Sequence, residues 1–376
     1  MSTTTMSRVR TEEHSTLQTL TAELLRQQET KADYVKDTRL LGFNSMSGGT
    51  SLLTIDGAED ETPLQGPDPD GHFVAGWKIN EHAHGQLSDR LGIPKRYYDR
   101  MRTEAPSLLD DNVRHWFINK PESRMVRVLD GNVRAFLSNR YRRLDNLDLM
   151  ERAILPELAK YEGDLVFHVA ALTDERLYVR ALLPKLQAEV KVGDIVQAGV
   201  QIRNSEVGSG KLEIAPFVWR LICLNGMVRA DMALGKYHIG REQEEQAFAI
   251  YRDDTLAADD EAFFLKARDA VGAALSDVTF GEIVRQLQES ATGEKIVNPV
   301  AAGEKLAQTF TLTDEEQGSF VRFLAEGGDL SKWGAANALT AAAKNVDHFE
   351  RQAELEGLGG QLAVLAPREW SSIAGA

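Results

Sequence analysis

The sequence predicts an α+β protein in which a central antiparallel sheet of β-hairpins is flanked by N-terminal helices and a C-terminal helical region. Apolar and polar residues alternate in the middle of the chain, and helical spacing dominates both ends. The 376 residues are 43% hydrophobic and 27% charged, which is enough apolar material for a core. We expect four segments: an N-terminal helix or flexible arm at 1–40, a mixed helical unit at 41–112, a basic α+β core at 113–240 and an acidic helical region at 241–376.

Helical elements are expected in the first part of the chain. Leucines at helical spacing in 17–25 predict a first helix. A second helix is expected to begin after Asn80, a good capping residue, and to end at Gly92, with a third starting at Pro94. Proline, aspartate and glycine residues in 56–71 predict a loop between these helical parts.

The first β-hairpin is predicted at 125–137. Asp130-Gly131 is a dipeptide typical of the tight turn that joins two antiparallel strands. Alternation along the strands puts Arg127 and Arg134 on the face opposite to the apolar side chains. This hairpin is therefore expected to have one apolar face and one arginine face.

An amphipathic helix at 145–160, interrupted near its proline, and two further hairpins at 165–183 and 195–223 complete the expected core. The rest of the chain has helical periodicity. Thr313 and Glu316 fit a capping box, in which each side chain binds a backbone amide at the start of a helix. The helices expected there lie at 261–275, 280–289, 313–325 and 332–354.

Charge is unevenly distributed along the chain. The net charge of -14 argues against a protein that coats duplex DNA through diffuse positive charge. Between Arg114 and Arg143, however, the sequence has eight basic and two acidic residues, whereas 241–376 has twelve basic and 24 acidic residues. This pattern indicates a confined anion-binding groove, with solvated, ion-paired arginines as the alternative.

Aromatic residues accompany the basic segment. Tyr141 lies within Arg140–Arg143, where three guanidinium groups around one ring suit phosphate contact combined with base stacking. Single-stranded nucleic acid is bound by such combinations, although Phe136 also fits a core position. The expected nucleic-acid-binding residues are Arg127, Arg134, Phe136, Arg140, Tyr141, Arg142, Arg143 and Lys211.

The glycine-rich stretch Gly208–Lys211 departs from a phosphate-binding loop at two positions. The motif requires a glycine where Ser205 stands and a serine or threonine where Leu212 stands. We therefore expect a hairpin tip, whose lysine is still able to touch a phosphate.

Candidate metal and catalytic residues are few. His82 and His84, two positions apart on a helix, point about 200° from each other and cannot easily share a metal ion. Cys223 is the sole cysteine, so the chain forms no internal disulfide. A hydrolytic site of Cys223 and His238 is an alternative, but the apolar surroundings of the cysteine favour a buried thiol. We expect a protein that is not an enzyme and needs no cofactor.

Several segments together resemble the phage- and plasmid-encoded protein family called domain of unknown function 932. The resemblance spans about Leu87 to Trp370 and implies a mobile-element setting, in which DNA passes through single-stranded forms. The hairpins and helix also look loosely like the core of phage single-strand annealing proteins, in topology only. The segments that carry the family resemblance are Leu87–Tyr98, Val133–Asp145, Arg220–Gly226, His238–Gly240, Ala336–Thr340 and Leu355–Gly360.

The sequence thus predicts a protein that binds single-stranded DNA in a basic groove, self-assembles into an oligomer, and promotes strand annealing in recombination or replication. Without a membrane-spanning stretch or an export signal, it is expected in the host cytoplasm, with no membrane partner. The alternative is an interaction protein that counters a host defence system or joins phage assembly. The acidic residues of 242–261 indicate this alternative, because such a run can mimic nucleic acid.

Overall fold

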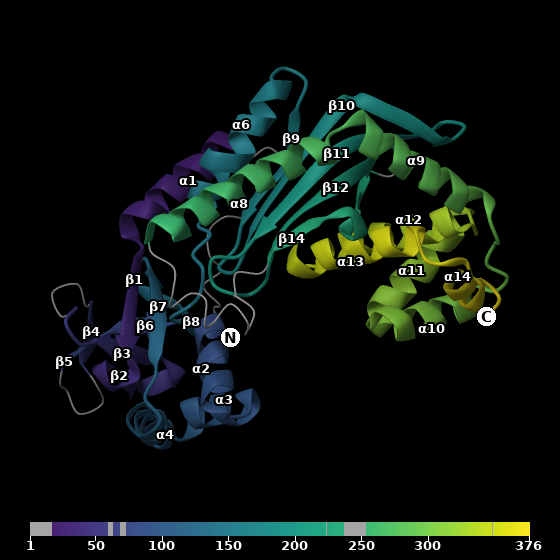
Figure 1. Ribbon diagram of the computed structural model, residues 1–376. Coiled ribbons are helices and arrows are strands. Elements are labelled where there is room, and N and C mark those ends of the chain that lie inside the picture. The colour runs from purple at the N-terminus through teal and green to yellow at the C-terminus, as the bar shows by residue number, and fades with distance from the viewer. Residues whose placement is uncertain (1–16, 59–62, 68–72, 223, 237–252, 348) are drawn as a thin grey trace.

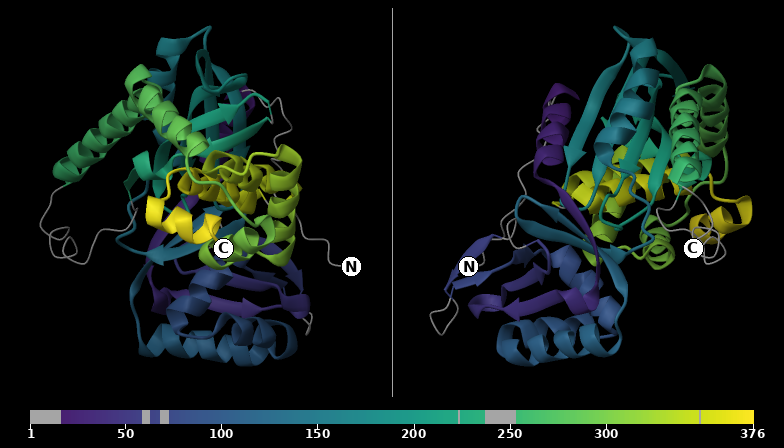
Figure 2. Two further views of the ribbon diagram at one scale, coloured as in Figure 1. Left: turned by 90° about the vertical axis from the view of Figure 1, so that its right-hand side faces the viewer. Right: turned by 60° about the vertical axis from the view of Figure 1, so that its left-hand side comes forward.

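The computed structural model describes residues 17–58, 63–67, 73–222, 224–236, 253–347 and 349–376. Its elements confirm the α+β class, with two curled sheets and helices at both ends of the chain (Figure 1). Figure 2 shows the first sheet and its helices below the second sheet and the C-terminal helices. We call these two parts the first lobe and the second lobe.

The first lobe is a six-stranded sheet covered on one face by three helices. Its strands pair antiparallel except for one parallel contact between β6 and β8. In sheet order they are β1 (Ala32–Asp37), β7 (Ser123–Leu129), β8 (Asn132–Ser138), β6 (Trp77–Ile79), β3 (Ser51–Ile55) and β2 (Leu41–Ser45). The helices are α2 (Glu81–Leu91), α3 (Lys95–Glu104) and α4 (Pro106–Asn119), and a ribbon of β4 (Leu64–Pro67) and β5 (Phe73–Ala75) lies outside the sheet.

Local signals in this lobe act as the sequence predicts. Asn80 caps α2 by accepting a hydrogen bond from the amide of Ala83, and Gly92 ends it with a positive φ of 66°. Asp130 and Gly131, with φ of 50° and 74°, form the turn between β7 and β8. This hairpin pairs with β1 and β6 rather than with the later hairpins, so the expected boundary between 112 and 113 runs through the first sheet.

The second lobe is built on a sheet of long strands with helices on both faces. The predicted hairpins of β9 with β10 and of β11 with β12 are confirmed. In sheet order the strands are β13 (Asn225–Val228), β12 (Leu212–Arg220), β11 (Asp194–Asn204), β10 (Leu177–Lys191) and β9 (Val166–Leu172), with β14 (Leu234–Lys236) also on β12. One face packs on α1 (Leu17–Thr30), α5 (Asn146–Leu149), α6 (Leu155–Leu158), α8 (Asp253–Ala274) and α9 (Asp277–Thr292).

The C-terminal helices pack against one end of the second sheet. The predicted capping box of Thr313 and Glu316 starts α11. The single helix expected at 332–354 is two helices instead, and the first of them is followed by a 3-10 turn at Ala343–Asn345. The helices are α10 (Pro299–Phe310), α11 (Asp314–Gly327), α12 (Lys332–Ala342), α13 (Phe349–Ala363) and α14 (Pro367–Ala374).

Two glycines let α13 approach its neighbours closely. A Cβ atom on Gly360 would lie 1.9 Å from the carbonyl oxygen of Val228 in β13. A Cβ atom on Gly359 would lie 2.2 Å from the methyl group of Thr340 in α12. Gly357, on the same helix, has no atom within 4 Å of the corresponding position.

We expect Gly360→Ala to destabilise the protein by about 2 kcal/mol, because the added methyl group collides with backbone and forces α13 away from the sheet. Gly357→Ala is the matched control and should stabilise the helix by up to about 1 kcal/mol, since alanine has the higher helix propensity. Urea unfolding of both variants measures the difference. Equal unfolding midpoints would show that α13 is not docked in this way.

Candidate nucleic-acid interface

The arginine face of the β7–β8 hairpin is buried between the two lobes. Arg127 exposes none of its surface, and its Nε and Nη2 donate to Asp33 at 2.8 and 3.0 Å. Its Nη2 also donates to Asp145 at 2.7 Å, and its Nη1 to the carbonyl oxygen of Glu206 at 2.9 Å. Burial raises the pKa of Asp145, but Arg127 and Lys31 outweigh it and lower the pKa to about 2. Asp145 is therefore ionised at neutral pH.

Three other predicted contact residues are buried in the same region. Arg134 donates to the Glu206 carboxylate at 2.5 Å, and the Tyr141 hydroxyl donates to the carbonyl oxygen of Ser205 at 3.0 Å. Phe136 stacks on Phe117 in the core of the first lobe, with ring centroids 6.0 Å apart.

The loop between β11 and β12, residues 205–211, covers this face and supplies one partner each to Arg127, Arg134 and Tyr141. The expectation that Arg127, Arg134, Phe136 and Tyr141 contact nucleic acid is therefore corrected. Arg127, Arg134 and Tyr141 bind the lobes to each other, and Phe136 fills a core.

We expect Arg127→Ala to destabilise the protein by about 3–5 kcal/mol, because it leaves Asp33 and Asp145 buried next to each other without their shared cation. Arg143→Ala is the control. Arg143 approaches the same Asp33 at 3.5 Å but is 57% exposed, so its loss should cost less than about 1 kcal/mol. Urea unfolding compares the two variants, and a similar small loss for both would refute the role given to Arg127.

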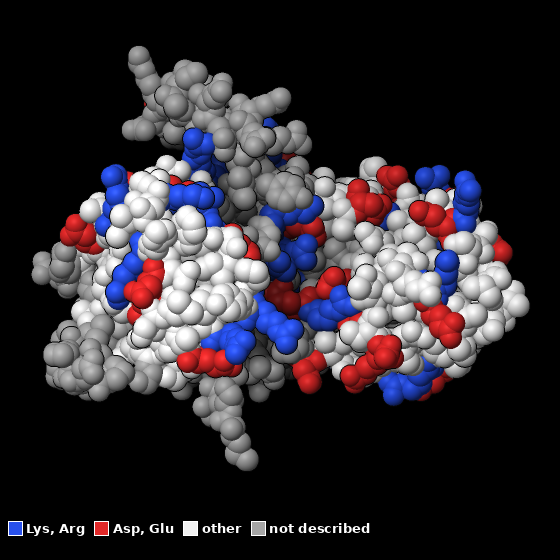
Figure 3. Space-filling model, turned by 90° about the horizontal axis from the view of Figure 1, so that it is seen from below, with Lys and Arg blue, Asp and Glu red and all other residues white. Residues whose placement is uncertain are grey.

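The remaining predicted residues differ in exposure, and only 14% of the Arg142 side chain is exposed. Arg140 and Arg143 are exposed, and Lys211, with 34% of its side chain exposed, lies 3.7 Å from Glu213. Seen from below, lysine and arginine side chains gather with acidic ones around the hollow between the first lobe and the C-terminal helices (Figure 3).

Acidic residues in the first half of α8 form ion pairs with Arg142 of the basic segment and with Arg152. Arg142 donates to Asp259 and to Asp260, both at 2.6 Å, and Arg152 bonds to Glu261. Three carboxylates of the acidic run are therefore used inside the protein. Each of them keeps between 40% and 58% of its side chain exposed, and residues 242–252 of the acidic run lie outside the described residues.

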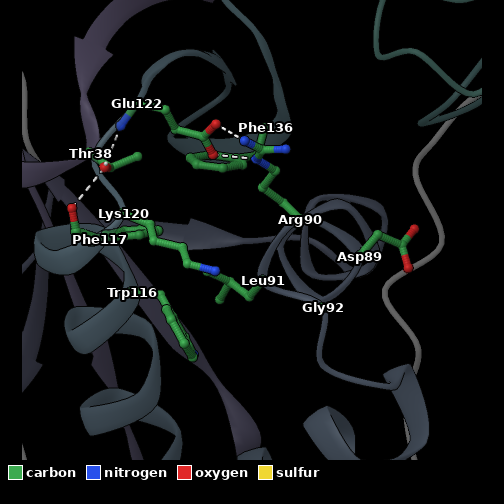
Figure 4. A pocket seen from close by; sticks show the side chains of 10 residues that line it. All are labelled: Thr38, Asp89, Arg90, Leu91, Gly92, Trp116, Phe117, Lys120, Glu122 and Phe136. Atoms are coloured by element: carbon green, nitrogen blue, oxygen red, sulfur yellow. Dashed lines mark hydrogen bonds and ion pairs between the residues drawn. The ribbon is translucent and has the colours of Figure 1, made fainter.

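A pocket that the sequence analysis did not identify lies between α2, α4 and the start of β7. Its volume is about 290 Å³, and three aromatic rings, those of Trp116, Phe117 and Phe136, line it (Figure 4). Phe117 and Phe136 are buried, whereas Trp116 is half-buried. The Lys120 ammonium lies over the Trp116 ring, 4.9 Å from its centroid. The spacing of Trp116 and Lys120 by four positions on one helix is the signal that identifies this pair.

Arg90 and Lys120 line this pocket with the carboxylates of Asp89 and Glu122, and Arg124 adds a third cation at the adjoining end of the β7–β8 ladder. Arg90 and Arg124 both bond to one carboxylate, Glu122. Burial and the repulsion of Arg124 lower the pKa of Arg90, and burial lowers the pKa of Arg124. Arg124 stands opposite Ser138, so Arg140 follows at the same end of the ladder. We call Arg90, Trp116, Lys120, Arg124 and Arg140 the Trp116 cluster.

The two histidines of α2 point to different parts of the molecule. The Nε2 of His82 lies 2.9 Å from the carbonyl oxygen of Val207, and its Nδ1 lies 3.5 Å from Glu175, both in the second lobe. His84 is buried in the first lobe, 2.9 Å from the hydroxyl of Tyr98. Among the described residues, no three His, Cys, Asp or Glu side chains form a group that could hold a metal ion. Cys223 and His238 lie outside the described residues.

These histidines respond to pH with opposite signs. Burial lowers the pKa of His84 to about 3 from its ordinary 6.5. Between these two pH values the unfolded chain binds a proton at His84 and the folded chain does not. The resulting stability is present above pH 6.5 and is lost as the pH falls. Burial also lowers the pKa of His82, but Glu175 and the Val207 carbonyl outweigh it and raise the pKa. Its contribution is present at low pH and is lost as the pH rises.

The free energy of unfolding of the wild type falls as the pH is lowered from about 7 to about 5. We expect His84→Gln to make this fall smaller by about 2 kcal/mol. His82→Gln should make the loss over this interval larger, because a stabilising protonation is removed. Urea unfolding of the wild type and of both variants at the two pH values tests the opposite signs. A shift in the same direction for both variants would contradict the assignment.

Comparison of the chain with protein-family models, with curated proteins and with solved structures found no match. None of the helices in the described parts of the chain has the length and apolarity that crossing a bilayer requires.

Proposed function

We propose that the protein binds single-stranded nucleic acid at the Trp116 cluster, and that this is DNA in the mobile-element setting that the family resemblance implies. One observation carries the proposal: the half-buried Trp116 ring, which the Lys120 ammonium covers, lines a pocket together with Arg90, and Arg90 shares the carboxylate of Glu122 with Arg124. Stacking faces within a positive surface are the features by which proteins hold single strands without sequence preference.

The electrostatics of the cluster favour an anion. Arg90 and Arg124 crowd Glu122, and the buried Nε of Arg124 has no hydrogen-bond partner among the described residues. A phosphate beside these guanidinium groups would relieve their repulsion and supply the acceptors that one carboxylate cannot. Arg140 and the exposed Arg143 would extend the phosphate path along the surface toward the loop of Lys211.

The dimensions of the pocket favour a single strand. A volume of about 290 Å³ is at the lower end of the range for small ligand sites and suits one base rather than a base pair. The Lys120 side chain covers the Trp116 ring and must swing away for a base to stack there, which leaves its ammonium beside the strand. Self-assembly and strand annealing are the parts of the proposal that come from the topological likeness to annealing proteins.

We expect tight binding of a labelled single-stranded oligonucleotide that weakens strongly between about 50 mM and about 200 mM salt, with duplex a poor competitor. Trp116→Ala should weaken binding by about 1–3 kcal/mol through lost stacking. Lys120→Glu and Arg140→Glu should each weaken binding and flatten its salt dependence. Fluorescence anisotropy measures all three effects.

Arg322→Glu is the matched control, because Arg322 covers the ring of Phe323 at 4.7 Å in the C-terminal helices and forms a similar cation–ring pair away from the cluster. This variant should bind like the wild type. Binding that ignores salt, or variants of the cluster that fold and bind normally, would remove the Trp116 cluster as the site.

A further inference from the structure

A second and larger cavity lies between the two lobes. Its volume is about 970 Å³, within the range of small-molecule sites. Its walls come from α1, from β6 and β8, from the turn between β9 and β10, and from the loop between β11 and β12. We call it the interlobe cavity, and its ligand does not depend on the proposed nucleic-acid function.

Two cations stand side by side on the sheet wall of this cavity. Lys78 of β6 pairs in register with Asn132 of β8, and Arg134 lies two residues further along β8 on the same face. Arg134 is only 7% exposed, yet it donates to Glu206 from Nη2 while its Nε finds no partner. Lys78 is exposed to the cavity and has no ion-pair or hydrogen-bond partner among the described residues. Both side chains therefore have donors to offer a ligand.

The wall carboxylates are compensated only in part by basic side chains of the protein. Four of the five bind protein cations, whereas Asp174, at the turn between β9 and β10, is exposed and has no such partner among the described residues. The bonded pairs are Glu23 and Asp130 with Arg26, Glu206 with Arg134, and Glu175 with His82. Glu23 and Asp130 share the one cation Arg26, and His82 is a cation only when protonated. The place for an anion is therefore beside Lys78 and Arg134, the two cations whose donors are incompletely used.

The remaining polar groups are suited to hydroxyl groups. Four carboxamides line the cavity, those of Gln27, Asn80, Asn132 and Asn146. Gln27 and Asn132 already donate from their amide nitrogens, which leaves their carbonyl oxygens as acceptors. Asn80 and Asn146 already accept at their carbonyl oxygens, which leaves their amide nitrogens as donors. The lining residues include no aromatic ring, so a nucleobase would have nothing to stack on.

From these contacts we infer that the interlobe cavity binds the phosphate monoester of a sugar. Lys78 and Arg134 hold the phosphate, while the carboxamides and Asp174 bind the hydroxyl groups. Such a ligand would touch both lobes, since Lys78 and Arg134 belong to the first and Asp174 to the second.

Isothermal titration calorimetry with ribose 5-phosphate tests the inference, with ribose and inorganic phosphate as the partial ligands. We expect binding of ribose 5-phosphate and at least tenfold weaker binding of either part alone. Lys78→Glu should weaken binding of ribose 5-phosphate more than tenfold. Lys305→Glu, a similar charge reversal at an exposed position of α10, should leave it unchanged.

Arg134→Lys is the second variant, because it keeps a positive charge beside Glu206 but removes the unpaired Nε. We expect it to weaken binding of ribose 5-phosphate while circular dichroism shows an unchanged fold. No heat with ribose 5-phosphate at millimolar concentration, or equal binding by Lys78→Glu, would overturn the site. Equal affinity for inorganic phosphate would overturn the assignment to a sugar ester.

Discussion

The buried guanidinium group of Arg127 is the interaction on which the arrangement of the two lobes depends. It joins β1, the start of α5 and the loop between β11 and β12 in one ionic cluster. A buried arginine needs this number of partners, because any vacant donor would cost free energy comparable to a lost hydrogen bond. Once the loop is fixed by Arg127, its neighbouring residues become available to Arg134, Tyr141 and His82. The path from the first sheet to the second therefore combines this ionic cluster with a small apolar one, made of Met125, Ala135, Leu137, Tyr141 and Val207.

Features that depend on neighbouring residues could be predicted from the sequence. The turn at Asp130, the caps of α2 and α11 and the pairing within each hairpin all follow from short-range patterns. The burial of Arg127 could not be predicted, because its partners Asp33 and Glu206 lie 94 and 79 positions away. Alternation correctly separated an arginine face from an apolar face. It contained no information on what covers either face.

The basic segment divides according to position on the sheet. Arginines in the middle of β7 and β8 face the other lobe and become structural, whereas cations at the ends of these strands and on α4 reach the surface. The Trp116 cluster draws on three elements, α2, α4 and the β7–β8 ladder, so composition alone shows the excess of charge but not the place where it is concentrated. Both cavities likewise join residues from separate parts of the chain.

The strand order of the first sheet also constrains how this lobe acquires its structure during synthesis. Strands β7 and β8 stand between β1 on one side and β6, β3 and β2 on the other, although they come last in the chain. Until residue 138 has been made, β1 and β6 have no neighbour to bond on the edges that face this gap. Closing the gap is a long-range step, and long-range pairing folds slowly. A fragment cut at 112 would carry two open strand edges, which are sites for pairing with other chains.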